Sequence, residues 1–70
     1  HIGEEIKLTM KAQNRTTVWL ARQLSCSRTN VYKIYASQSL DTNTLRRISV
    51  ILDVDFFAML STELSLHNPN

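Results

Sequence analysis

Apolar residues recur every three or four positions along most of this chain, which is the spacing of one face of a helix. No window alternates between apolar and polar residues with the period of two that indicates a half-buried strand. The pattern therefore predicts an all-α fold, a compact bundle of four to five short helices. Its apolar series are Ile2, Ile6 and Met10; Leu20, Ala21 and Leu24, with Val18 or Trp19 as an additional anchor; Val31, Ile34 and Tyr35; Leu45, Ile48, Ile51 and Leu52; and Phe56, Phe57, Ala58, Met59 and Leu60.

Polar residues between these series predict where the helices begin, because an N-cap side chain accepts a hydrogen bond from the first turn. The helices are expected over about residues 2–13, 18–24, 27–36 and 42–52, with a short fifth helix following. Residues 1–64 then form one domain, and residues 65–70 are expected to be a flexible tail. The expected caps are Thr16 or Thr17, then Ser27, then Asp41 or Thr42, and finally Asp55.

Charge is distributed unevenly along the chain. All eight lysines and arginines lie between residues 7 and 47, where the only acidic residue is Asp41, so this segment carries a net charge of +7. The other five acidic residues lie in the two flanks. Such asymmetry favours a polyanionic partner, although a charge bias taken alone more often marks a solvated face.

The residue types needed for catalysis or metal binding do not occur together. A single cysteine, Cys26, can form no intramolecular disulfide and is expected to be buried at a turn, and His1 and His67 lie near opposite ends. The sequence has no paired carboxylates, no Ser/His/Asp set and no phosphate-cradling glycine loop, so we expect neither enzymatic activity nor a cofactor or metal. No apolar run approaches the ~20 residues of a membrane span. The expected location is the cytoplasm, in association with the nucleoid.

The second and third predicted helices are separated by about three residues, a spacing that permits helix-turn-helix packing. That packing needs a small residue where the helices cross, and Ala21 is suitably placed. The apolar residues Leu20, Leu24, Val31 and Ile34 are spaced to hold both helices to a core.

Residues 17–36, TVWLARQLSCSRTNVYKIYA, resemble the helix-turn-helix of the Cro and phage-repressor type, the XRE family. The family's small alanine matches Ala21 and its β-branched anchor matches Val31, and its apolar positions match Leu20, Leu24, Cys26 and Ile34. The likeness extends over about residues 2–60, through IGEEI at 2–6 and TLRRI at 44–48. It implies a lambda-repressor-like fold and a prokaryotic or phage transcriptional regulator that binds double-stranded DNA sequence-specifically.

Two positions depart from the family pattern. Ser25 occupies a turn position that is usually glycine, so the backbone there is strained if it requires a positive φ. Met10 and Tyr35 stand where many members carry an Arg and Glu ion pair between the first helix and the recognition helix. An apolar contact in place of a buried ion pair need not cost stability.

A recognition helix contacts base edges from its N-terminal turns, while helix starts and nearby hydroxyls contact phosphates. Arg28 is the best candidate for a bidentate contact to guanine, and Arg46 and Arg47 are either solvated or add a general field. The base-contacting candidates are Arg28, Thr29 and Lys33, with Asn30 and Tyr32 at the edges of the face. The phosphate-contacting candidates are Asn14, Arg15, Thr16, Thr17, Ser27, Ser39, Thr42 and Asn43.

The C-terminal segment has more apolar surface than one short helix buries against its own domain. We expect Phe57, Leu60 and Leu64 to form an isologous homodimer contact, and the alternative is that they complete the core. Two other functions are open: an antitoxin-type regulator whose C-terminal segment grips a toxin, and a small helical protein-interaction module that does not bind DNA.

Overall fold

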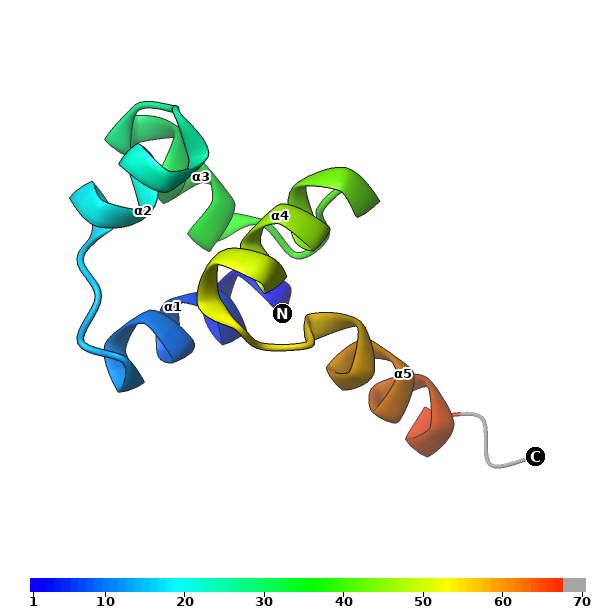
Figure 1. Ribbon diagram of the computed structural model, residues 1–70. Coiled ribbons are helices and arrows are strands. Elements are labelled where there is room, and N and C mark those ends of the chain that lie inside the picture. Colours follow the sequence, from blue (N-terminus) through cyan, green and yellow to red (C-terminus); the bar gives the residue numbers. More distant parts are fainter. Residues whose placement is uncertain (68–70) are drawn as a thin grey trace.

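Five short helices, joined by turns of three to five residues, make up the computed structural model, which describes residues 1–67 and the side chains of residues 1–62. No strand occurs in this part of the chain, so the predicted all-α bundle is confirmed. Figure 1 shows the arrangement of the elements. They are α1 (Ile2–Ala12), α2 (Thr17–Leu24), α3 (Arg28–Ala36), α4 (Thr42–Leu52) and α5 (Phe56–His67).

The helices begin where a side chain caps the first turn. In each of the last four, a side-chain oxygen accepts a hydrogen bond of 3.0–3.1 Å from the backbone N–H three residues further on. Where the sequence left two alternatives, for α2 and α4, the earlier residue of each pair is the cap. An imidazole nitrogen caps α1 in the same way, at 3.1 Å, which the sequence pattern did not indicate. The caps in chain order are His1, Thr16, Ser27, Asp41 and Asp55.

The last helix is longer than expected. α5 continues to His67, so it includes the first three residues of the segment expected to be a flexible tail. Residues 68–70 lie outside the described part of the chain, and the domain boundary at residue 64 stays a prediction.

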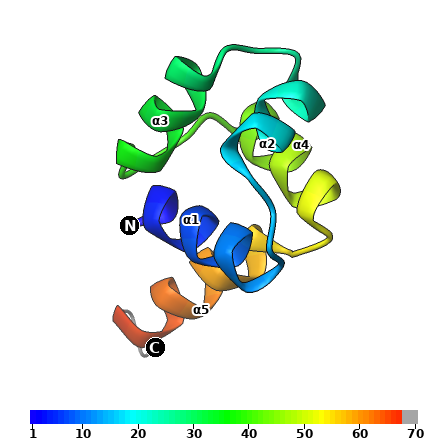
Figure 2. The ribbon, with the colours of Figure 1, turned by 90° about the vertical axis from the view of Figure 1, so that its left-hand side faces the viewer.

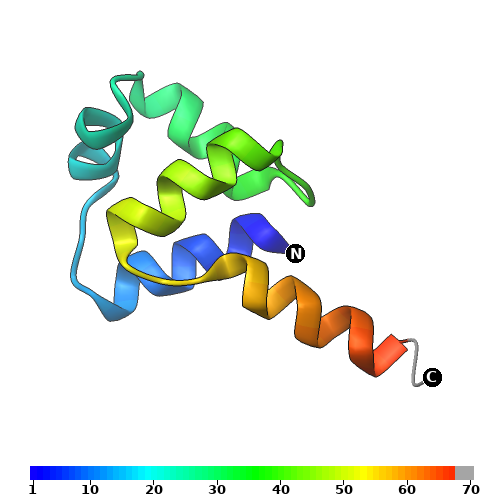
Figure 3. The same ribbon diagram turned by 45° about the vertical axis from the view of Figure 1, so that its right-hand side comes forward.

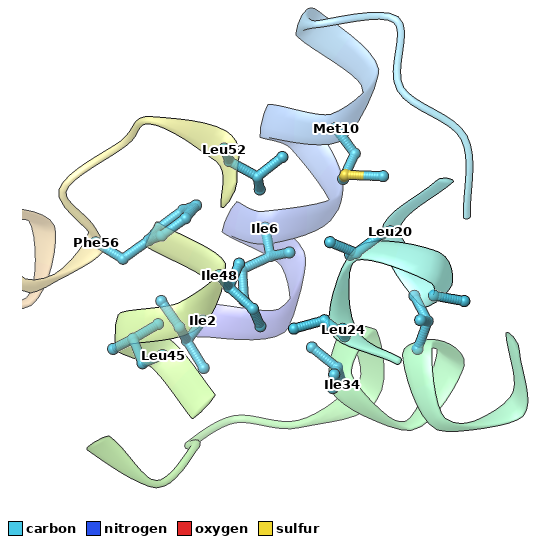
Figure 4. Close-up of a cluster of buried hydrophobic side chains, with 12 residues drawn as sticks. Ile2, Ile6, Met10, Leu20, Leu24, Ile34, Leu45, Ile48, Leu52 and Phe56 are labelled. Atoms are coloured by element: carbon cyan, nitrogen blue, oxygen red, sulfur yellow. The ribbon is translucent and has the colours of Figure 1, made fainter. Parts of the chain in front are cut away.

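A single apolar core lies between the helices, and every helix contributes to it (Figure 4). The residues that the periodicity placed inward in the first four helices are buried, except Tyr35 and Ile51, which are half-buried against the core. At the start of α2, Trp19 rather than Val18 packs against the core. Cys26, expected to be buried, is half-buried against the core, because the turn that carries it lies at the rim. The buried residues are Ile2, Ile6, Met10, Leu20, Ala21, Leu24, Val31, Ile34, Leu45, Ile48, Leu52 and Phe56.

The only glycine lets α1 approach the end of α3. The Gly3 N–H donates a hydrogen bond of 3.0 Å to the carbonyl of Ser37. A Cβ atom on Gly3 would lie 2.5 Å from the carbonyl oxygen of Ile34 and closer still to that of Tyr35, and both are backbone atoms. Gly3 therefore sets how closely the C-terminal end of α3 packs on α1.

The turn between α2 and α3 has the backbone conformation that glycine usually supplies. Ser25 adopts φ 54° and ψ 44°, in the left-handed region, so the position does require a positive φ. Its N–H donates to the carbonyl of Arg22, and the Cys26 N–H donates to that of Ala21. These hydrogen bonds satisfy carbonyls that the end of α2 leaves unpaired. Serine, unlike glycine, has a Cβ atom that makes the left-handed conformation unfavourable.

We expect Ser25→Gly to raise the free energy of unfolding by about 0.5–1 kcal/mol, because relief of the left-handed penalty outweighs the added flexibility of the unfolded chain. Chemical denaturation of both proteins measures the difference. The control is Ser39→Gly, at a position without a positive φ, which is expected to lose stability. A destabilised Ser25→Gly protein would contradict the explanation.

The last helix leaves the body formed by the first four (Figures 1 and 3). Seen from another side, α3 and α5 lie on opposite sides of α1 (Figure 2). Among its residues with described side chains, Phe56 is buried, whereas Phe57, Met59 and Leu60 are 37–39% exposed. A helix with apolar residues around its circumference normally has partners on several sides, so much of α5 is available for contact. No helix in the described part of the chain has the length and apolar character needed to cross a membrane.

Candidate nucleic-acid interface

The outward face of α3 brings together all five side chains predicted to contact bases. Val31 and Ile34 are buried on the inward face, so the helix has one orientation on the core. At 3.6 residues per turn the remaining polar residues fall on the opposite face, with Asn30 at its edge. The exposed residues are Arg28, Thr29, Asn30, Tyr32 and Lys33.

This face is held in place at both ends of the helix. At the start of α3, the Ser27 hydroxyl oxygen accepts a hydrogen bond of 3.1 Å from the Asn30 N–H. At its end, the Ser37 hydroxyl donates to the carbonyl of Lys33 at 2.7 Å, and Gly3 packs against the last turn. A helix fixed in this way presents its outer side chains with little freedom of tilt.

The residues predicted to contact phosphates fall at three helix starts. In Figures 1 and 3, α3 lies between the start of α2 and the start of α4. The candidates therefore flank α3 on two sides, with one more at its own first turn. Asn14, Arg15, Thr16 and Thr17 are at the start of α2, Ser27 is at that of α3, and Ser39, Thr42 and Asn43 are at that of α4.

Two of the three helix starts at this surface, those of α2 and α3, favour anions, whereas that of α4 is capped by the carboxylate of Asp41. α1 has Glu4 and Glu5 in its first turn, the usual complement to the positive end of the helix dipole. By contrast, α2 and α3 have no acidic residue in the first turn. Thr16 and Ser27 each accept one N–H of these first turns, but no carboxylate offsets the helix dipoles or the remaining N–H groups, which is the arrangement that binds phosphate at helix N-termini.

Several of the candidate side chains already have partners within the protein. The Asn43 side-chain oxygen accepts a hydrogen bond of 3.1 Å from Arg46, which leaves its NH₂ group as a donor. The guanidinium of Arg15 stacks over the ring of Trp19, with its carbon 4.3 Å from the ring centroid. Stacking orients this cation while its in-plane N–H groups stay available to an anion.

Arg47 has a structural role that the sequence did not reveal. Its guanidinium donates a hydrogen bond of 3.1 Å to the carbonyl of Leu24, the last residue of α2. The positive charge thereby lies at the negative end of the α2 dipole and ties α4 to the turn before α3. Of the two arginines left open, Arg47 joins two helices, whereas Arg46 is exposed and donates to Asn43 within α4.

Met10 and Tyr35 occupy the two positions where many members of the XRE family carry an Arg and Glu ion pair. Met10 is buried, and Tyr35 is half-buried and packs against the core. The Tyr35 hydroxyl lies 3.4 Å from the Thr17 hydroxyl, so α3 and α2 also meet here. Both Met10 and Tyr35 line a hollow of about 590 Å³ between α1 and α3.

That hollow also contains residues that sequence reasoning assigned no role. Lys7 and Lys11, one turn apart on α1, line it together with the predicted phosphate contact Arg15. The signal that could have found them is their i, i+4 spacing, which places both lysines on one face of the helix. Their proximity to α3 depends on tertiary packing and is not visible along the chain.

No family model, curated protein or solved structure matches this chain. The assignment of a function therefore depends on the geometry of these residues. Among the described residues, no group of three or more His, Cys, Asp or Glu side chains is placed to hold a metal ion.

The single carboxylate of the basic segment is engaged at the start of α4. The Thr44 hydroxyl donates to Asp41 at 2.6 Å, and the Thr44 N–H donates to its other oxygen at 3.0 Å. These hydrogen bonds, the hydroxyl first, hold the pKa of Asp41 below its ordinary value. Its negative charge is thus retained for capping α4.

The lowered pKa of Asp41 predicts the pH dependence of its contribution. The stability that depends on the ionised carboxylate is present above about pH 4 and is lost as the pH falls through the folded-state pKa. We expect Asp41→Asn to lower the Tm at neutral pH, and the difference from the wild type to shrink under acid conditions. Thermal melts across this range test the point, and a difference independent of pH would contradict it.

Proposed function

We propose that this protein is a sequence-specific double-stranded DNA-binding transcriptional regulator whose α3 enters the major groove. The observation that carries the proposal is the outward face of α3, with five exposed polar side chains on a helix held by the core. The starts of α2 and α3, which have no acidic residue in their first turns, and the net charge of +7 over residues 7–47 supply the electrostatic attraction that duplex DNA requires. These features support a helix-turn-helix at residues 17–36.

Within this proposal the contacts divide by chemistry. Arg28, in the first turn of α3, donates two parallel hydrogen bonds to guanine O6 and N7, and Lys33 follows one turn later. Thr29 contacts a thymine methyl or a phosphate. The hydroxyls and amides at the helix starts bind the backbone and fix the register of α3 along the groove.

Selection of bound sites from random duplexes tests this function. We expect one enriched sequence containing two inverted half-sites about 10 base pairs apart, since a symmetric dimer places its two recognition helices one DNA turn apart. The proposal would be wrong if no sequence were enriched from the pool.

The dimer is proposed to form through α5. Phe56 enters the core, whereas Phe57 and Leu60 remain more than one-third exposed, which argues against the alternative that they complete the core. The side chain of Leu64, the third predicted contact, lies outside the described part of the structure. A palindromic operator requires a symmetric dimer, so a second copy of α5 is expected to cover these exposed residues.

We expect the double substitution Phe57→Ser and Leu60→Ser to convert a dimer into a folded monomer, because it removes apolar area from the contact while sparing Phe56. Sedimentation equilibrium measures the mass, and half-site duplexes measure the DNA affinity that remains. Leu8→Ser, at a residue that is 60% exposed on α1, is the control that should not alter the mass. Wild-type protein that is monomeric at all concentrations would contradict the dimer.

The antitoxin-type alternative has one observation in its favour. The exposed apolar residues of α5, Phe57, Met59 and Leu60, are also suited to a partner of another kind. An antitoxin-type regulator would use the same DNA-binding face as the proposed homodimer, and the two hypotheses differ only in which protein covers α5. Co-purification from the native host distinguishes the two, because a stoichiometric partner protein on α5 would replace the second copy.

A further inference from the structure

The hollow between α1 and α3 has walls from three helices and the turn that precedes α2. Its volume of about 590 Å³ falls in the range of small-ligand sites. The buried side chain of Met10, the aromatic ring of Tyr35 and Ala36 supply apolar walls, and the rest of the lining is charged or hydroxylated. The charged and hydroxylated residues are Glu4, Lys7, Lys11, Arg15, Thr17, Tyr32 and Tyr35.

The polar lining of the hollow is dominated by hydrogen-bond donors. Three cations, Lys7, Lys11 and Arg15, face one carboxylate, Glu4, so the lining has a net charge of +2. Three hydroxyl groups add further donors. A group with several anionic oxygens, such as a phosphate, satisfies many donors at once, and charge-assisted hydrogen bonds are the stronger ones.

Much of the lining is already ordered. The rings of Tyr32 and Tyr35 meet edge to face, with centroids 6.2 Å apart. Arg15 is stacked on Trp19. The hydroxyls of Thr17 and Tyr35 are 3.4 Å apart, beyond the usual length of a strong O–H···O hydrogen bond, so both keep capacity for another acceptor. An anion would therefore meet donors that need little rearrangement.

We propose that this hollow is a phosphate-binding site completed by Lys7 and Lys11. This site deepens the proposed function, and the part of its test that uses DNA rests on that function. Arg15 and Thr17 connect the hollow to the predicted phosphate contacts, and Tyr32 connects it to the outward face of α3. The phosphate comes either from the backbone of a bound duplex or from a free phosphorylated compound. In the second case the hollow would couple a small ligand to the DNA-binding face.

The DNA arm of the test measures the salt dependence of duplex binding. Each phosphate neutralised contributes about −0.9 to the slope of log affinity against log salt, so Lys7→Gln and Lys11→Gln together should make the slope shallower by about 1.8. Arg22→Gln removes an exposed cation of α2 that does not line the hollow and should leave the slope nearly unchanged. Circular-dichroism melts of each variant confirm that the fold is retained.

The free-ligand arm uses inorganic tripolyphosphate and the fluorescence of Trp19, the only tryptophan in the chain. Because Arg15 both lines the hollow and stacks on this ring, binding should change the emission, and the change should disappear in the lysine double variant. If this ligand is the source, it should also compete with duplex DNA. A positive result in either arm supports the site. A change in the salt slope alone points to the duplex backbone as the source of the phosphate, and a tripolyphosphate response alone points to a free compound.

The two proposals fail in different ways. If the wild type binds duplex DNA but the lysine variants keep its salt slope and tripolyphosphate leaves Trp19 unchanged, the phosphate site is overturned and the regulator stands. If tripolyphosphate binds in a lysine-dependent manner but no duplex binds, the site stands and the regulator is overturned.

Discussion

Alanine in place of Gly3 is expected to destabilise the fold by about 1–3 kcal/mol, the usual cost of inserting a methyl group into a packed contact. The new Cβ would overlap the carbonyl oxygens of Ile34 and Tyr35, which are backbone atoms and cannot turn aside. Relief requires α1 and α3 to separate, which also weakens the hydrogen bond from Gly3 to Ser37. Urea denaturation of the two proteins measures the change.

The sign of the Gly3 effect distinguishes the tertiary contact from local helix preference. In an exposed helix, alanine stabilises relative to glycine by up to about 1 kcal/mol. A tight contact reverses that sign. Lys7→Ala, an exposed substitution on the same helix, serves as the control and should change stability little. A Gly3→Ala protein more stable than the wild type would contradict the packing of α3 on α1.

Removing the Arg28 side chain is expected to reduce the preference for the selected operator by roughly 5- to 150-fold, which corresponds to about 1–3 kcal/mol for a bidentate guanine contact. Arg28 is exposed and contributes nothing to the buried core, so the thermal melt should stay close to that of the wild type. Competition between the operator and a scrambled duplex measures the specificity directly.

A cation at another position gives the comparison for Arg28. Arg22→Ala removes the same charge from an exposed position on α2 that no prediction assigns to the DNA. It should weaken both duplexes slightly and equally, because a general field carries no sequence information. If Arg28→Ala behaved like Arg22→Ala, Arg28 would not read a base.

The sequence predicted the helices and the core because both depend on local patterns. Apolar spacing identified all twelve buried core residues. Eleven of them lie in the first four helices, and the twelfth is Phe56 at the start of the fifth. Capping preferences placed the starts of the last four helices, since an N-cap acts on its own first turn. The unusual turn at Ser25 was also predictable, because the family resemblance marked a position that prefers glycine.

Contacts between distant residues were not predictable in the same way. The hydrogen bond from Arg47 to Leu24, and the approach of Gly3 to the end of α3, join residues more than twenty positions apart. The hollow beside Lys7 and Lys11 exists only when α1 lies against α3. Periodicity assigns a face to each residue but does not say which helix it will meet.

The most direct test of DNA binding is a titration of wild-type protein with its selected duplex over a range of salt concentrations. The proposed interface predicts that log affinity falls linearly with log salt, with a slope of about −0.9 for every phosphate contacted, and that the selected duplex binds more tightly than a scrambled one throughout. Absence of duplex binding, or an affinity that does not change with salt, would contradict the account.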